Sequence, residues 1–316
     1  MAQQSIGPAQ LVLTASVARR YYLDGRSKLD IAEEFGISRF KVARLLEAGR
    51  AAGLVHVEIR HPGNLDVELS AELQSALGLR HAIVVDTLDD DPALLRAQIG
   101  RAGGELVSEI VTSDDVLGLG WARSLIAMRD AMTRLAPCPV VQLTGALSRP
   151  DIDGSSIELV RDVARLGGGE PYFFYAPMIV PDATTAGVLR RQPDVARCLE
   201  KAAVVTTAVV GLGSWDPPYS TVWDAISPAE RADLHELGVR ADVSGILLAG
   251  DGQPVPAPLA DRLIGIDAAQ LHRIPEVIAL AYAAEKAAAV RAAVRGGYVT
   301  SLVTHTRLAR AILGRS

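Results

Sequence analysis

The stretch from Ser27 to Arg50 constrains the fold more than any other part of the 316-residue chain, because it predicts two helices joined by a tight turn. Ser27 is a suitable N-cap for the first helix, and Asp30 follows it near the positive helix end. Gly36 stands where the chain must leave this helix, and glycine adopts the left-handed conformation of such a turn at low cost. Ser38 can cap the second helix, whose buried face is expected to consist of Val42, Leu45 and Leu46.

The outward-facing residues of the second helix are of the types that contact DNA. A recognition helix enters the major groove with its N-terminal residues at the base edges, and arginine suits a bidentate contact with guanine. We therefore expect Ser38 and Lys41 to contact phosphates, which fix position without reading sequence. The expected base contacts are Arg39, Phe40, Ala43 and Arg44.

An ordinary helical hairpin with a solvated charged face is the alternative interpretation of this segment. The helix-turn-helix interpretation is favoured because a small contact residue, a turn glycine, an apolar plug and a serine cap occur in the expected order, as Ala32, Gly36, Ile37 and Ser38. A β-like run from Leu54 to Arg60 follows. We therefore expect a winged helix-turn-helix DNA-binding domain over residues 1–61.

The net charge of −5 looks unfavourable for a DNA-binding protein until it is divided along the chain. Residues 1–61 carry nine Lys/Arg and six Asp/Glu, whereas the remainder carries 23 and 31. A mildly basic unit on an acidic body is compatible with operator binding, since only the local footprint must be positive. The small positive excess indicates that a homo-oligomer, either a dimer or a tetramer, binds double-stranded operator DNA.

The two cysteines, Cys138 and Cys198, are too few for a disulfide framework or a zinc finger, so no metal site and no cofactor are expected. Their scarcity fits a reducing cytoplasm. The first residues lack the charged start and apolar run of a signal peptide, and no apolar stretch is long enough to span a bilayer. The sequence therefore predicts a cytoplasmic protein without a membrane partner.

The segment His61–Asn64 breaks the pattern and separates the first domain from residues 62–316, where strand-like and helix-like stretches alternate. This alternation predicts a Rossmann-like, mostly parallel α/β fold with helices on both faces, whose ligands bind outside the carboxyl ends of the strands. The strand candidates are His81–Asp86, Asp115–Gly120, Val140–Thr144, Pro171–Tyr175, Ala203–Gly211, Ser244–Leu248, Arg262–Ile266 and Tyr298–Val303. The helix candidates are Leu65–Leu77, Ala93–Val111, Ala122–Leu135, Ser155–Leu166 and Val277–Arg295.

The first loop with the composition of a ligand site runs from Gly118 to Ser124 after a predicted strand. Its glycines let the backbone approach a phosphate, a helix begins there, and Arg123 and Ser124 add donors. The alternative is a tight turn with a buried Trp121.

Further polar positions lie in or beside other predicted elements, with Asp242 just before a strand candidate and Lys286 on the last predicted helix. Gln142 and Thr144 are suited to hydrogen bonds with sugar hydroxyls, although a simple turn is an equal alternative. Backbone amides of Gly211 and Gly213 can line a pocket floor. Asp242 can accept hydrogen bonds from a polyol, or it forms a turn. Lys286 is a compact phosphate-seeking charge, with a surface pairing to its neighbour Glu285 as the alternative.

Taken together, these segments resemble the SorC-type transcriptional regulators, also called the sugar-binding-domain family. The resemblance spans nearly the whole chain and rests on SKLDIAEEFGISRFKVARLL, LGLGWARSL, VQLTGAL, VVGLGS, RLIGID and EKAAAVRAAVRGGYVTSLVTHTRLARAIL. It implies a winged helix-turn-helix, an effector domain resembling sugar-phosphate isomerases, a phosphorylated sugar as ligand, and assembly into dimers or tetramers.

The resemblance also implies roles for single residues. Gly120, Trp121, Arg123 and Ser124 fall at the phosphate-binding turn, and Thr144 and Gly145 at a sugar-contact loop. Asp242 occupies the acidic position and Lys286 the helix lysine near the phosphate. The chain departs from the family at Thr304-His-Thr306, and at Thr144, where others have Asn or Lys; a Schiff base is therefore not expected at that loop.

The sequence thus predicts a DNA-binding regulator of a carbohydrate-utilisation operon whose DNA affinity is set by a phosphorylated sugar or polyol. The alternative is a sugar-phosphate isomerase or deaminase with an additional N-terminal domain. Catalysis of that kind needs a positioned general base. Asp242 and His305 are the candidates and are far apart in sequence, so no catalytic residue is assigned. Kinship of fold does not by itself carry an enzymatic function.

Overall fold

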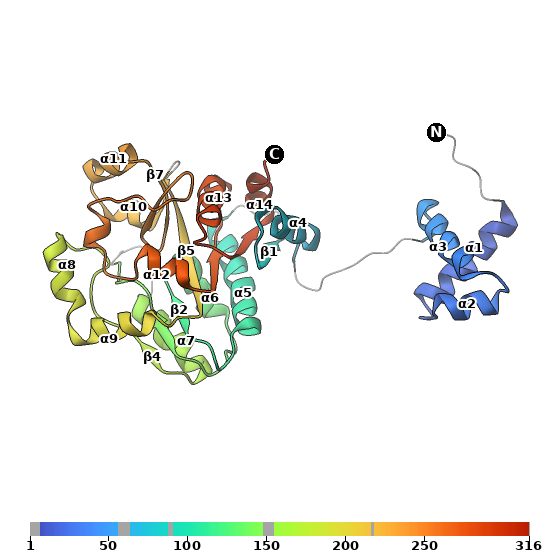
Figure 1. The fold of residues 1–316 in the computed structure, drawn as a ribbon, viewed down its shortest axis with the longest axis horizontal. Helices are drawn as coiled ribbons and strands as arrows, with labels where there is room; N and C mark the ends of the chain where they lie inside the picture. Colours follow the sequence, from blue (N-terminus) through green and yellow to red (C-terminus); the bar gives the residue numbers. More distant parts are fainter. Residues whose placement is uncertain (1–6, 56–63, 88–90, 148–154, 216–217, 316) are drawn as a thin grey trace. The chain divides into compact units, whose positions relative to one another are not determined.

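A computed structural model describes residues 7–55, 64–87, 91–147, 155–215 and 218–315 (Figure 1). The chain divides into two compact units, Met1–Pro62 and Gly63–Ser316, and each is considered by itself. The predicted wing at Leu54–Arg60 falls outside the described residues from position 56 onward, as does the start of the predicted boundary at His61.

The N-terminal unit consists of α1 (Pro8–Tyr22), α2 (Lys28–Glu34) and α3 (Arg39–Ala51). Ser27 forms a capping box with Asp30 at the start of α2, and the Ser38 hydroxyl accepts a hydrogen bond from the Lys41 amide at the start of α3. Gly36 has φ +61° in the turn between α2 and α3, as expected of a residue that must adopt the left-handed conformation. The three helices enclose a small core of Val17, Ala18, Ile31, Ala32, Val42, Leu45 and Leu46.

The second unit is built on a parallel sheet with the strand order β1-β10-β9-β5-β2-β3-β4. Five of its strands, among them β5, are buried along their whole length, which explains their nearly continuous apolar sequences. The bounds are β1 (His81–Val85), β2 (Leu117–Leu119), β3 (Val140–Gln142), β4 (Pro171–Tyr172), β5 (Thr207–Trp215), β9 (Glu276–Leu280) and β10 (Ser301–His305).

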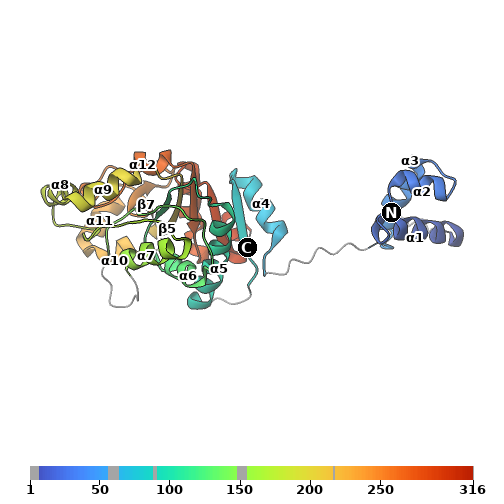
Figure 2. The same cartoon turned by 90° about the horizontal axis from the view of Figure 1, so that it is seen from below.

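Helices cover both faces of this sheet (Figures 1 and 2). Side chains alternate between the faces along each strand, so that in β5 Val209 packs on one side and Ala208 and Val210 on the other. The Val209 side carries α5 (Pro92–Ile110), α6 (Arg123–Ala131) and α7 (Ser156–Gly167). The opposite side carries α4 (Val67–Leu77), α8 (Ala183–Arg190), α9 (Pro193–Ala202), α12 (Ala268–Arg273), α13 (Ala287–Arg295) and α14 (Thr306–Ile312).

The second half of β5 extends beyond the parallel sheet and pairs antiparallel with two further strands, β6 (Pro218–Tyr219) and β7 (Val239–Val243). β7 continues into β8 (Ile246–Ala249) through the two-residue turn Ser244–Gly245. Both turn residues have positive φ, +50° and +91°, which is typical of the tight hairpins that match strand twist. The short helices α10 (Thr221–Ala225) and α11 (Pro228–Glu236) pack against β5 and β7 of this extension, whereas η1 (Ala260–Arg262) packs against α8.

The strand order reverses between β2 and β5. From β2 the chain adds β3 and β4 on one side, whereas from β5 it adds β9 and β10 on the other. In open α/β sheets such a reversal leaves a crevice at the carboxyl ends of the two strands, because their following connections diverge to opposite sides. The topology therefore directs attention to the segments that follow β2 and lie along β5.

The predicted mostly parallel α/β architecture is confirmed, but several predicted elements were wrong in detail. Val277–Arg295 is not one helix: it begins within β9, passes through η2 (Ala284–Lys286) and only then becomes α13. Arg262–Ile266 is not a strand, since it forms only isolated bridges, to Ile179 and Thr144. Gly211–Ser214 does not follow a strand but lies inside β5. Within the described ranges, no helix is long and apolar enough to cross a membrane.

Candidate functional site

A cavity of about 160 Å³ opens at the carboxyl edge of the sheet, where the strand order reverses. Its walls include Trp121–Ser124 after β2, Gly211–Gly213 within β5, the Ser244–Gly245 turn, and Tyr282 with Lys286 after β9. The cavity thus lies where the topology of a parallel sheet predicts a ligand. Its lining is mixed, with cationic, anionic, hydroxyl and aromatic groups facing one space.

The part of the cavity at the start of α6 is suited to an anion. Helix α6 begins at Arg123 without a side-chain cap, so its first amide groups have no partner within the helix and carry a partial positive charge. Arg123 and Ser124 line the cavity at this helix start. The Ser124 hydroxyl donates a hydrogen bond to the Leu280 carbonyl oxygen at 3.1 Å, which fixes the start of α6 against the end of β9.

Lys286 supplies a second positive charge to the cavity. Its Nζ donates to the Leu212 carbonyl oxygen at 2.6 Å and lies 5.4 Å from the centre of the Tyr282 ring. Burial of the amine lowers the pKa of Lys286 to about 8; the nearby Asp242 carboxylate opposes this shift and Arg123 adds to it. The lysine is thus held as a readily available cation whose hydrogen bond can be exchanged for one to an anionic ligand.

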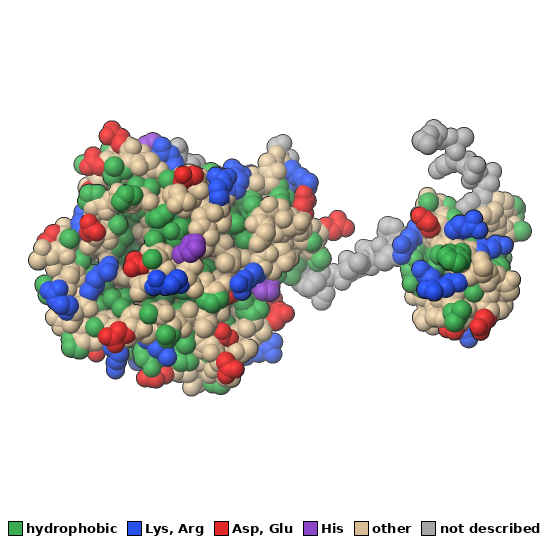
Figure 3. Space-filling model, in the orientation of Figure 1, with side chains coloured by type: hydrophobic (Ala, Val, Ile, Leu, Met, Phe, Trp, Pro, Cys, Tyr) green, Lys and Arg blue, Asp and Glu red, His purple; other side chains and the backbone are tan. Residues whose placement is uncertain are grey.

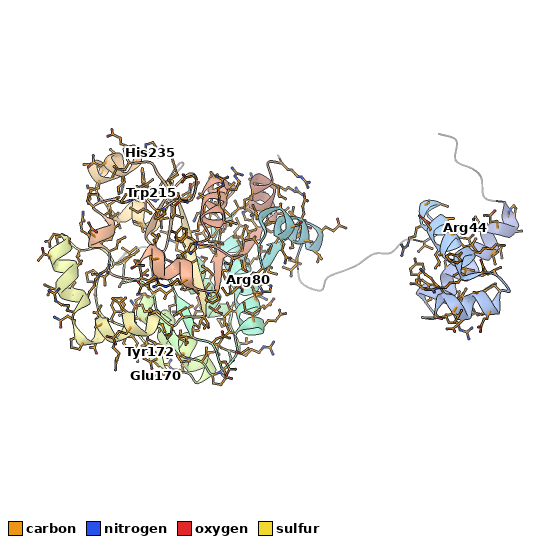
Figure 4. All side chains as sticks on the ribbon, viewed as in Figure 1. Arg44, Arg80, Glu170, Tyr172, Trp215 and His235 are labelled. Carbon is orange, nitrogen blue, oxygen red and sulfur yellow. The ribbon has the colours of Figure 1, made fainter. Side chains whose placement is uncertain are left out.

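The cavity also contains a carboxylate, that of Asp242, a β7 residue that is only 4% exposed. Its Oδ1 accepts hydrogen bonds from the Ser220 hydroxyl at 2.5 Å and from the Trp215 indole at 3.0 Å. Burial raises the pKa of the Asp242 carboxyl, while these two hydrogen bonds and the charge of Lys286 act in the other direction. Trp215, labelled in Figure 4, is itself held edge-on against Trp223 with ring centroids 5.2 Å apart.

Two buried polar atoms on the cavity have no protein hydrogen-bond partner among the residues that the structure describes. These are the indole Nε1 of Trp121, a residue 5% exposed, and the Oγ of Ser244. A buried donor without a partner is unfavourable, so both atoms are available to a polar ligand. Ser244 approaches the site closely because Gly120 has no side chain, and a Cβ there would overlap the Ser244 hydroxyl.

Of the twelve predicted effector-site residues, the structure brings seven together on this cavity: Trp121, Arg123, Ser124, Gly211, Gly213, Asp242 and Lys286. Glycine is required at Gly213, because a Cβ would overlap the Asp242 carboxylate. It is also required at Gly211, where a Cβ would overlap the side chain of Ala122. These two glycines therefore allow the side chains of Asp242 and Ala122 to lie close to the backbone of β5.

The other five predicted residues lie off the cavity, and three of them are glycines at which a side chain would overlap a neighbouring residue. Gly118 faces Leu143 and Val205 inside the sheet, Gly120 faces Ser244, and Gly145 packs on the backbone of Pro177 and Met178.

The side chains of Gln142 and Thr144 are also placed elsewhere. The Gln142 amide donates to the Thr144 carbonyl oxygen at 2.8 Å and to the Ser156 hydroxyl at 3.0 Å, and its own oxygen accepts from the Phe174 amide. Gln142 thus has internal partners in place of a cavity contact. Thr144 lines a second cavity of about 110 Å³, which shares Met178, Ser244 and Gly245 with the first.

Sequence reasoning missed Ser220, Ser244 and Tyr282 as cavity residues. Ser244-Gly245 between two apolar runs is a two-residue hairpin signal that was available in the sequence. Ser220 and Tyr282 carry no such signal, since their role depends on contacts with Asp242 and Lys286, which are distant along the chain.

The N-terminal unit presents a second candidate site on α3. Ser38, Arg39, Phe40, Lys41 and Arg44 are exposed, whereas Ala43 is half-buried. Arg44 is labelled on this helix in Figure 4. The predicted DNA contacts therefore lie on the exposed part of the helix that follows the glycine turn, where a recognition helix would have to carry them.

A three-helix unit with a basic, exposed helix and an α/β unit with a polar cavity are the two parts expected of a transcriptional regulator that carries a ligand-binding domain. Residues 61–314 match the family model described as "Putative sugar-binding domain". The chain is 30% identical to the uncharacterized transcriptional regulator YjhU of Escherichia coli over 93% of this chain and 92% of that protein. It is also 30% identical to the transcriptional regulator LsrR of Klebsiella pneumoniae, over 96% and 94%.

Solved structures show the same fold. The full-length sorbitol operon regulator SorC of Klebsiella pneumoniae superimposes with a TM-score of 0.73 at 22% identity, covering 96% of this chain and 99% of that one. A domain of a possible sugar-binding transcriptional regulator from Arthrobacter aurescens gives 0.72 at 23% identity, covering 80% and 100%. The chain belongs to the SorC-type family of sugar-binding transcriptional regulators. It is accordingly a regulator and not an enzyme, and the isomerase or deaminase alternative is not supported.

Proposed function

We propose that this regulator binds operator DNA through α3 and that a phosphorylated sugar or polyol in the 160 Å³ cavity controls its affinity for DNA. The genes it controls would then form a carbohydrate-utilisation operon. The observation that carries the proposal is one cavity that combines two sets of residues, an anion-binding set (Arg123, Lys286 and the start of α6) and a hydroxyl-binding set (Asp242, Trp121 and Ser244).

The anion-binding set of residues favours a phosphate over a neutral group. Arg123, Lys286 and the first turn of α6 place three sources of positive potential around the same space. Asp242 is a buried carboxylate on the same cavity, and it disfavours a second anionic group beside it. A ligand with one phosphate and several hydroxyl groups satisfies both sets of residues at once.

The hydroxyl-binding set of residues supplies both acceptors and donors. Asp242 accepts hydrogen bonds, Trp121 donates through its indole nitrogen, and Ser244 can do either. Sugar and polyol hydroxyls are both donors and acceptors, so they complement this set. An apolar ligand would leave the buried Trp121 and Ser244 atoms without partners.

Control of DNA affinity would follow from linkage between the two sites. A ligand shifts an equilibrium between two states of the protein only by its differential affinity for them. Because the positive charge of residues 1–61 is modest, we propose that a homo-oligomer, dimer or tetramer, places two readers on two half-sites of the operator. We propose the cytoplasm as the location, where the chromosome and phosphorylated sugars occur together.

The proposal is tested by titrating labelled DNA from upstream of the gene with the full-length protein, followed by candidate sugar phosphates. Arg39→Ala should relax the base preference, whereas Lys41→Ala should weaken binding to every sequence. The absence of sequence-specific binding under all conditions would refute the proposal.

The effector site is tested with Arg123→Ala and Lys286→Ala, which should abolish the response to sugar phosphates and leave DNA binding intact. Arg165→Ala is the matched control, since Arg165 is an exposed arginine of α7 that does not line the cavity. A normal response from both cavity variants would show that the effector binds elsewhere.

A further inference from the structure

Phe40 is the most exposed large hydrophobic side chain among the described residues, with 83% of its surface in contact with solvent. It is the second residue of α3, in the first turn of the helix. Leaving an aromatic ring in water forgoes the stabilisation that its burial would provide. The ring lies at the start of the helix that we propose to contact DNA, so a bound duplex would cover it.

The spacing of α3 shows which way the ring points. Val42, Leu45, Leu46 and Gly49 are buried and define the inner face of the helix. At 100° per residue, Phe40 and Arg44 lie together on the opposite face, one turn apart. The ring and the guanidinium group thus share the face that is available to a partner.

The charges around Phe40 indicate a polyanionic partner. Asp24 and Glu34 are engaged in ion pairs with Arg20 and Arg26, and the one acidic residue of α3, Glu47, lies two turns from Phe40. By contrast, Arg39, Lys41 and Arg44 make no ion pair within the part of the chain that the structure describes. Figure 3 shows hydrophobic side chains bordered by Lys and Arg on this unit. An apolar ring inside a cationic border complements a surface that is anionic overall but apolar at one point.

Only one feature of the major groove has that character. The C5-methyl group of thymine is the apolar group displayed there, surrounded by hydrogen-bonding base edges and flanked by phosphates. We propose that Phe40 reads thymine methyl groups in the operator, next to the bases contacted by Arg44. This inference rests on the proposed function, because it assigns one residue of the proposed DNA interface to one chemical group of the DNA.

The experiment uses the full-length protein and an operator selected from random DNA duplexes. Thymines within the footprint are replaced by uracil, which pairs identically and lacks only the methyl group, and the Kd is measured at fixed salt. Each methyl group that Phe40 covers should contribute about fourfold to the affinity, since one buried methylene-sized group is worth that factor. Replacement in both half-sites should therefore cost about fifteenfold.

Phe40→Ala should bind the thymine duplex more weakly and no longer distinguish it from the uracil duplex, whereas Phe40→Leu should retain part of the preference. The control is Leu23→Ala, which removes another apolar side chain of this unit that is 77% exposed. It should leave both affinities unchanged. Lys41→Ala should weaken both duplexes equally, because it acts on phosphates.

The outcomes separate the inference from the function on which it rests. If no sequence is selected, the proposed function fails and this inference with it. If an operator is selected but uracil replacement or Phe40→Ala leaves its discrimination unchanged, the methyl assignment alone is overturned. Equal loss on both duplexes in Phe40→Ala would instead indicate a ring inserted between base pairs. A changed oligomeric state in that variant would indicate a contact between copies.

Discussion

Gly213→Ala tests whether the Asp242 carboxylate of the cavity is held between Ser220, Trp215 and Gly213 as the structure places it. A Cβ at this position would overlap the Oδ1 atom of Asp242 and lie 2.6 Å from the Ser220 Cβ. Since Gly213 and Asp242 are paired across β5 and β7, the carboxylate can move away only by leaving its two donors, Ser220 and Trp215. A backbone shift would instead disturb the pairing of the two strands.

The expected loss of stability follows from these contacts. Two hydrogen bonds to a buried charged group contribute roughly 1.5–3 kcal/mol each. Replacing glycine by alanine returns about 0.5–1 kcal/mol, because it reduces the freedom of the unfolded chain. The free energy of unfolding of the second unit should therefore fall by about 2–5.5 kcal/mol, which is a large part of the ~5–15 kcal/mol typical of a domain.

Urea unfolding followed by tryptophan fluorescence measures this change selectively, because all three tryptophans, Trp121, Trp215 and Trp223, belong to the second unit. Gly250→Ala is the matched control: it lies in the turn after β8, and its Cβ would come no closer than 3.9 Å to the Arg240 side chain. If Gly213→Ala is as stable as wild type to within ~1 kcal/mol, the carboxylate is not confined as the argument requires.

Three further predictions concern protonation and capping. The affinity for a sugar phosphate should be highest between the phosphate pKa of about 6 and the Lys286 pKa of about 8. It should fall at higher pH as the amine loses its proton. Calorimetry across pH would show no decline above about pH 8 if the lysine is not involved. Glu230, which pairs with Arg262 at 2.6 Å, has its pKa lowered from 4.5 to about 2, so its contribution is present above pH 4.5 and lost as the pH falls through 2. Because the pair is partly exposed, Glu230→Gln should cost only about 1 kcal/mol at pH 7 in urea unfolding and much less at pH 2, where the carboxyl is half protonated; an equal cost at both pH values would contradict this. Ser27→Ala should remove the capping box and speed amide exchange in α2 about fivefold, with unchanged exchange as the contrary result.

The parts of the fold that were predicted well are those set by local signals. Helix α5 was expected at Ala93–Val111 and is found at Pro92–Ile110, because it is long, amphipathic and preceded by an Asp cap. Strand β9 was missed because Glu276–Leu280 is a short apolar run next to an alanine-rich segment, and periodicity does not separate such a strand from a helix. Its strand character comes from burial between β5 and β10, which is a tertiary effect.

The same distinction explains which site residues were found. The helix start at Arg123 is a local signal, so it could be predicted from the sequence. The loops that lie beside this helix start depend on the strand order, which no local signal specifies. Strand β5 lies between β2 and β9, so its residues and Lys286 converge on the start of α6. Strand β3 lies on the other side of β2, so Thr144 reaches a different cavity, although its composition equally suits a sugar. Ser244 lies on the edge of the first cavity instead. Its hairpin forms only because β5 extends beyond the parallel sheet and pairs with β7.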